Sequence, residues 1–453
     1  MTERFLQLEL GSTKDRILPV VVDGTAGLCE TFYYSITCFS QNTNIEAQTV
    51  LGKGATLRVV PSQGDPSSVN GVITSWGAIG LPDEHGWQCY QMILEPWYAL
   101  LRQVNDCRGF VDKSVVEIVD AVFSDHGFYH YHFDQLSETY DPIPYTVQYN
   151  ESSYDFVQRL LCRYGLYTSF DQSNPGIHSL NIRDNGTFKQ PHLGELKYRP
   201  GQSGPRKRDL SSRVKSLRGE LDADNKMNQT HLDLIKTHYE AENKADQENT
   251  KIQYGQPELS SLCLEKSGPP SQSAVHHQRP GFAGTTTLRA QSGKHPTRVE
   301  HHYPGIGQTP EQLKHFADLS ERRHALAGHA LYAATGNVQI APGTRFQFTG
   351  FPIKSQNGQY TVEKVHYYAE DFTGIQGLNH GRETFYCANL KAFRRDIQYA
   401  PPKPSKPVPK HTQLATVRAA DDKMIHAGEH ASVKIEFDWD HHSQGDLNQL
   451  PWA

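Results

Sequence analysis

Residues 32–38 read Phe-Tyr-Tyr-Ser-Ile-Thr-Cys, and the same kind of run recurs throughout the first part of the chain. Aromatic and β-branched side chains dominate it, which is typical of a β-strand. Similar runs surround it, separated by turns rich in glycine or proline: Phe5 to Leu10, Ile17–Val22, Thr56–Val60, Gly71–Trp76 and Trp87–Leu94. Since no helical periodicity interrupts them, residues 1–95 are predicted to form an antiparallel sandwich or barrel.

Two capped helices are expected next, in an α+β region at residues 96–190. Ser114-Val-Val-Glu117 is a capping box. The apolar positions that follow it have helical spacing: Val115, Ile118, Val119, Val122 and Phe123. A second helix is predicted to begin at Ser152 or Ser153 and to end at Gly165. A strand, Leu166–Phe170, should follow it.

Residues 191–290 are predicted to be a polar, partly disordered insertion. Segments such as 218–229 and 241–251 contain almost no large apolar side chains. Such segments bury too little surface to offset the entropy lost on ordering. We therefore expect a mobile loop here, with at most a few edge strands.

Order is expected to return over residues 291–399. Thr309-Pro-Glu-Gln312 supplies an N-cap and a proline at the first helical position, and the helix should extend towards Leu331. The strands predicted after it are Thr344–Gly350, Gly358–Tyr368 and Phe385–Leu390. A linker at 400–411 follows, with five prolines in residues 400–410.

The last segment, residues 412–453, is predicted to be a small β unit. Val433-Lys-Ile-Glu-Phe-Asp-Trp-Asp440 alternates apolar and polar side chains, and a polar turn around Gly445 follows. A strand of this kind needs a partner for its backbone groups. We expect either a downstream continuation or another chain to provide that partner.

Composition argues against several functional classes. The formal net charge is −5 and the pI about 6.5, so the chain lacks the basic field of a nucleic-acid-binding protein. The N-terminus has no apolar signal region, and no apolar run reaches the roughly 20 residues of a membrane helix. We therefore expect a soluble protein made in the cytoplasm without a signal peptide. The seven scattered cysteines favour reduced thiols over a disulfide framework.

Histidine is the one residue type that suggests chemistry. It forms four groups, at residues 126–132, 276–277, 301–302 and 441–442. His130 and His132 would share one face of a strand, which is compatible with metal ligation, although half-buried, hydrogen-bonded histidines explain the groups equally well. Nucleotide and nucleophile motifs are absent. The sequence therefore assigns no catalytic, cofactor-binding or metal residues, and predicts no enzyme and no cofactor.

Several ordered motifs resemble VgrG, the spike protein family of bacterial type VI secretion systems, which is related to phage tail hub-and-spike proteins. Their positions are Leu94–Leu101, Cys107–Phe110 with Lys113–Ile118, Gln148–Leu160 with Gly165–Tyr167, Tyr303–Gly305 with Pro342–Phe346 and Asn357–Tyr360, and Val433–Asp440. The resemblance covers about residues 1–185 and 290–453. Residues 195–290 do not follow the usual sequence pattern of the family, and neither does Asp446–Trp452.

The resemblance implies a mainly β fold with α+β portions. Two tube-forming β-barrel domains with inserted helices, 1–95 and 291–399, would be followed by the start of an OB-fold at 412–453. It also implies a homotrimer that docks on the Hcp tube hexamer, contacts baseplate components, and carries a PAAR tip protein and effectors. The assembly would be built at the baseplate and exported by the contractile apparatus. These 453 residues do not include the sequence of the family's needle, so we expect the natural protein to continue beyond Ala453.

Two rival functions remain open at this stage. One is the hub of a phage tail or of a phage-tail-like contractile particle, which sequence does not separate from a secretion spike. The other is a metal-dependent or envelope-degrading hydrolase, which only the histidine groups support.

Overall fold

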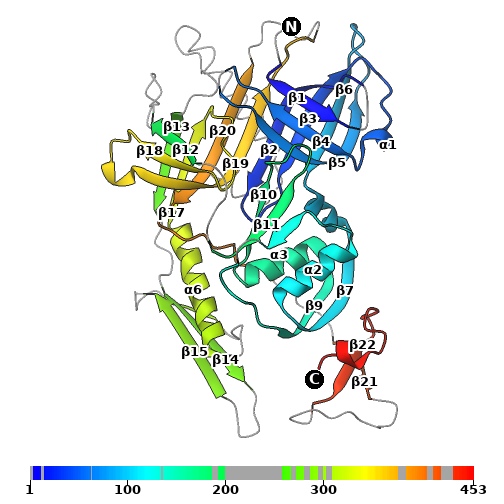
Figure 1. Ribbon diagram of the computed structural model, residues 1–453, viewed down its shortest axis with the longest axis vertical. Helices are drawn as coiled ribbons and strands as arrows, with labels where there is room; N and C mark the ends of the chain where they lie inside the picture. The colour runs from blue at the N-terminus through cyan, green and yellow to red at the C-terminus, as the bar shows by residue number, and fades with distance from the viewer. Residues whose placement is uncertain are drawn as a thin grey trace.

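The computed structural model describes residues 4–11, 15–62, 64–133, 136–185, 192–198, 258–266, 272–279, 286–293, 299–302, 309–375, 384–405, 412–419 and 432–452. Figure 1 shows a mainly β molecule with a large sheet at one end and a smaller α+β unit beside it. No helix within those ranges is long and apolar enough to cross a membrane.

Six antiparallel strands form the first half of the large sheet. In sheet order they are β1 (Leu6–Leu10), β4 (Gly54–Val59), β5 (Ser67–Ile79), β6 (Gln88–Glu95), β3 (Tyr33–Ser40) and β2 (Leu18–Gly27), with a short helix, α1 (Ala47–Val50), before β4. In β3, half-buried and fully buried side chains alternate strictly, as its sequence predicts. The strands expected in residues 1–95 are thus confirmed.

The second half of the sheet closes on itself. Its strands are β19 (Gly358–Glu370), β18 (Arg345–Thr349), β12 (His192–Tyr198), β13 (Glu258–Lys266), β17 (His329–Thr335) and β20 (Phe385–Arg394). Each strand pairs with the next, and β20 pairs again with β19, so the six form a ring. The 3-10 turn η2 (Lys354–Gln356) precedes β19. β2 also pairs with β19, which makes one continuous sheet of both halves.

Two sequence-based expectations are wrong in this region. β12 and β13 are two of the strands that make up the ring, where they connect β18 to β17. Only edge strands were expected between residues 195 and 275. Leu196 and Leu259 are fully buried there, and this explains their incorporation. The helix expected to approach Leu331 ends at Ala327, because Gly328 caps it and Leu331 belongs to β17.

The α+β unit follows β6. It contains η1 (Trp97–Gln103), β7 (Asn105–Lys113), α2 (Val115–Asp125), β8 (Tyr131–Phe133), β9 (Ile143–Ser152), α3 (Ser153–Arg163), β10 (Tyr167–Asp171) and β11 (Ser179–Arg183). Ser114 and Glu117 make the predicted capping box, and all five predicted apolar positions of α2 are buried. α3 begins after its N-cap Ser152. β7 and β9 pair antiparallel, and neither strand was predicted from the sequence.

Two smaller parts complete the molecule. α6 (Pro310–Ala327) packs against β14 (Gln272–Arg279) and β15 (Thr286–Gly293), and β16 (Val299–His302) pairs with β14 (Figure 1). Near the C-terminus, β21 (Ala415–Arg418) pairs with β22 (Lys434–Phe437), and Lys434 bridges to Trp452 beyond η4 (Leu447–Gln449). This small unit is compatible with the start of an OB-fold, which stays a prediction, as do the predicted domain boundaries.

Candidate functional site

The histidine pair that the sequence singled out does not assemble a site with a third ligand. Both side chains are exposed: His130 immediately precedes β8, and His132 lies within it. Neither belongs to a group of three potential metal ligands among the described residues. The side chains of residues 276–277 and 301–302 lie outside the described set, so the structure does not test those two groups.

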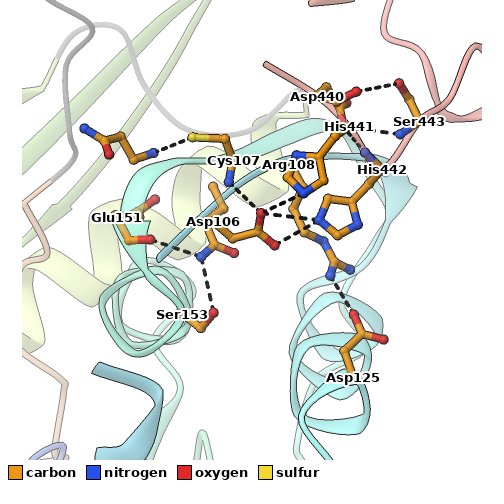
Figure 2. Close-up of polar contacts among 12 residues, drawn as sticks. Asp106, Cys107, Arg108, Asp125, Glu151, Ser153, Asp440, His441, His442 and Ser443 are labelled. Carbon is orange, nitrogen blue, oxygen red and sulfur yellow. Dashed lines mark hydrogen bonds and ion pairs between the residues drawn. The ribbon is translucent and has the colours of Figure 1, made fainter. Parts of the chain in front are cut away.

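The structure instead brings His441 and His442 to Asp106 at the start of β7. His442 Nε2 lies 3.0 Å from Asp106 Oδ2, and His441 Nε2 lies 3.7 Å from Asp106 Oδ1. The two imidazole rings lie with their centroids 4.3 Å apart, and both turn towards the same carboxylate (Figure 2). In the described part of the chain, this is the one group of three such side chains whose ligand atoms all lie within 4.8 Å of one another.

A tight turn after β22 orients both rings. The buried Asp440 carboxylate accepts hydrogen bonds from the backbone N–H groups of His442 and Ser443, at 3.2 and 3.3 Å. Glu436 accepts another from Gly445 N–H at 2.9 Å. Because the chain curls here rather than extending, two consecutive side chains can face the same group.

Aromatic packing holds this turn against the α+β unit. The Trp439 ring meets Tyr149 of β9 edge to face, with centroids 5.6 Å apart, and stacks on Phe437 at 4.9 Å. On the facing strand, Cys107 N–H donates to Asp106 Oδ1 at 2.7 Å, which fixes the orientation of that carboxylate. Both sides of the cluster are therefore held by contacts outside it.

A pocket of about 260 Å³ adjoins the cluster, lined by Asp106, Arg108, Val122, Asp125, His126, Gln148, Ser153 and His442. Arg108 Nη1 contacts Asp125 Oδ2 at 2.6 Å, and its guanidinium lies 4.3 Å from the centroid of the Phe110 ring. The positive charge of Arg108 is thus already paired. The arrangement offers two imidazole nitrogens and a carboxylate next to an open space, which are donor types that bind transition-metal ions.

Sequence reasoning named residues 441–442 as a group but did not find Asp106. That residue is 336 positions from His442, and no local motif connects the two. The i, i+1 spacing of the histidines gave no signal, because in a strand the two side chains would point to opposite faces.

Elsewhere in the described residues, side chains with strongly shifted pKa values owe the shift mainly to burial in the packed interior. Burial, reinforced by the nearby His130, lowers the pKa of His178 to about 4. Burial and the adjoining Cys162 thiol raise the pKa of Cys29 well above its ordinary value, so it remains a protonated thiol of low reactivity. The cysteines whose side chains are described are all free, in agreement with the expectation of reduced thiols.

Comparison with known proteins relates this chain to a family of phage tail proteins. The sequence profile described as phage tail baseplate hub (GPD) matches residues 25–372, which is most of the chain. The chain belongs to the phage tail baseplate hub family. The match begins near the end of β2, includes β3 to β6 and the whole α+β unit, and ends just after β19.

Relatives of this hub protein include the type VI secretion system spike protein VgrG1a of Pseudomonas aeruginosa. The two are 26% identical over 459 residues, covering 99% of this chain and 63% of VgrG1a. The chain therefore spans less than two thirds of the length of that relative. The resemblance to the VgrG family seen in the sequence is confirmed.

Solved structures show the same fold at low identity. An E. coli protein described as a component of the type VI secretion system, c3393, superimposes with a TM-score of 0.63 at 15% identity, over 98% of this chain and 92% of that one. A 43 kDa prophage tail protein from Shewanella oneidensis gives a TM-score of 0.51 at 12% identity, over 88% of this chain and 100% of that one. The mainly β hub fold is thus shared by secretion-system and prophage tail proteins.

Proposed function

We propose that this protein forms the base of the cell-puncturing spike of a type VI secretion system, acting as a homotrimer that docks on the Hcp tube. In this role it delivers effectors by mechanical puncture, and its work requires no catalytic residue. The observation that carries the proposal is the match to a spike protein over 99% of the chain. VgrG1a is named as a spike protein, and the family profile is described as a phage tail baseplate hub.

The architecture supports a mechanical role. Both halves of the large sheet are joined through the β2–β19 pairing, so a force applied to one half is carried to the other by backbone hydrogen bonds. The register runs without interruption from Lys364↔Gly27 to Glu370↔Val21. A rigid, strand-rich body suits a component that must resist compression during contraction of a sheath.

The proposed life cycle of the protein follows from that role. The chain is made in the cytoplasm, assembles at the baseplate, and leaves through the contractile apparatus. Its proposed partners are a second and third copy of itself, the Hcp hexamer, baseplate components, a PAAR tip protein and effectors. Nucleic acid is not among them, given the net charge of −5.

A gene deletion in the source bacterium tests this function. Deletion should abolish release of Hcp into the medium, and the intact gene supplied in trans should restore it. Native mass spectrometry of the whole protein should give a trimer. Normal Hcp release from the deletion strain would overturn the proposal, as would a protein that stays monomeric at high concentration.

The second candidate is the hub of a phage tail or phage-tail-like particle, which the family description and the prophage tail structure favour. In that case the deletion leaves Hcp release unchanged and abolishes sedimentable tail particles after induction. Electron microscopy of induced cultures separates the two functions.

A further inference from the structure

Two side chains of the C-terminal turn and one of β7 meet at a single point. Asp106 supplies a carboxylate, and His441 and His442 supply one Nε2 each. Zn²⁺ binds imidazole nitrogen at about 2.0–2.1 Å and carboxylate oxygen at about 2.0–2.2 Å, with tetrahedral geometry. Tetrahedral ligands at such bond lengths stand roughly 3.3–3.6 Å apart. Measured to the single oxygen Asp106 Oδ1, His442 Nε2 lies 3.3 Å away and His441 Nε2 lies 3.7 Å away, both close to that separation.

We propose that Asp106, His441 and His442 bind one divalent transition-metal ion of the Zn²⁺ class, with water completing the coordination. The site joins the turn after β22 to β7 and goes beyond the mechanical function proposed above, on which it does not depend. The nitrogen and oxygen donors match the preference of Zn²⁺ and of its neighbours in the first transition row.

An ion pair alone explains this geometry less well. One carboxylate neutralises one imidazolium, so a second histidine facing it gains little. The side chains of His441, His442 and Asp106 are 69%, 39% and 20% exposed, and ion pairs at such solvent-screened sites contribute little to stability. A doubly charged cation uses all three groups at once, which accounts for the convergence of both rings.

The surroundings suit an ion. The guanidinium of Arg108, which lines the adjoining pocket, is paired with Asp125 at 2.6 Å and so does not oppose a cation at full strength. The Cys107 N–H bond on Oδ1 orients the Asp106 carboxylate, in the way that outer groups orient metal ligands. The adjoining pocket of about 260 Å³ gives an ion and its water access from solvent.

Zinc titration of the tag-free 453-residue chain tests the site. We expect the histidine double variant His441→Gln, His442→Gln to lose one equivalent of Zn²⁺ in calorimetry, relative to the unmodified chain. Asp106→Asn should weaken the same equivalent by roughly tenfold or more. Co²⁺ should show the visible absorption of a low-coordinate nitrogen and oxygen site in the unmodified chain, and the double variant should lack that band.

The control variant is His130→Gln, His132→Gln, which also removes two exposed histidines but leaves the site intact. It should retain the full zinc stoichiometry and the Co²⁺ band. Unchanged binding in the His441, His442 double variant would overturn the proposal, and so would an equal loss in the control. If the double variant fails to fold, Asp106→Asn decides, and unchanged affinity in that variant overturns the site. Hcp release plays no part in this test, so failure here is distinct from failure of the proposed function.

Discussion

The buried His178 ring accepts a hydrogen bond at Nε2 from Trp97 N–H, and the two nitrogens lie 2.9 Å apart. The ring also packs edge to face against Phe32, with centroids 5.8 Å apart. Burial makes a positive charge on this ring costly, and the nearby His130 adds to the cost, so the pKa of His178 falls from 6.5 to about 4. The residue joins the start of η1 to the loop before β11.

This residue predicts a loss of stability in mild acid. The folded pKa lies below the unfolded one, so the stabilisation is complete above about pH 6.5 and is lost progressively as the pH falls to about 4. The free energy of unfolding should fall by up to about 3 kcal/mol from this group. Urea denaturation at several values of pH measures it.

His178→Gln is the comparison for this prediction. Glutamine can still accept from Trp97 N–H but does not titrate, so its stability should depend less steeply on pH between about 6.5 and 4. Identical slopes for variant and unmodified chain would show that His178 does not contribute.

Helix ends show how elements are fitted together. α2 and α3 are both followed by a glycine with positive φ, Gly127 at 72° and Gly165 at 79°. The two differ in their surroundings. A Cβ at Gly127 would meet nothing within 4 Å, whereas one at Gly165 would lie 3.2 Å from Leu319 Cδ1 on α6. The end of α3 is therefore also a contact with α6.

We expect alanine at these two positions to have unequal costs. Gly127→Ala should destabilise by about 1–2 kcal/mol, the cost of a left-handed conformation for an L-residue. Gly165→Ala should cost more, since Leu319 must also move. Chemical denaturation of both variants measures the difference. Equal costs would mean that α6 does not press on the end of α3.

At the scale of the whole molecule, the decisive feature is the seam between β2 and β19. Gly24 of β2 lies between Tyr34 of β3 and Tyr367 of β19 in the pairing register. The two tyrosine rings stack across it, with centroids 5.7 Å apart. A Cβ at Gly24 would come within 2.2 Å of Tyr34 Cδ1, so any larger residue displaces this stack.

Gly24→Ala should therefore weaken the joint between the two halves of the sheet. We expect a loss of about 1–3 kcal/mol from overpacking, with hydrogen exchange accelerated in both β2 and β19. Gly77→Ala in β5 is the matched control, because its Cβ would meet nothing within 4 Å. It should change stability by no more than about 0.5 kcal/mol. Equal effects of both substitutions would contradict a tightly packed seam.

The sequence by itself determined the local elements with strong repeating patterns. The first six strands and the N-caps of α2, α3 and α6 were predicted from residues close together in the chain, since period-2 alternation and capping are local interactions. β12 was not predicted as a sheet strand, because Leu196 is its one fully buried side chain and polar residues and a glycine separate it from Leu193 and Tyr198.

Only the tertiary structure decided how distant segments meet. The ring from β19 to β20 depends on pairings such as that of β12 with β18, in which Glu195 lies opposite Gln347, and no local pattern encodes them. The meeting of Asp106 with His441 and His442 has the same origin. Local sequence specifies which side chains of a strand face the core, whereas the strands that pair with it follow from the packing of the whole chain. The candidate metal site exists only after that packing is complete.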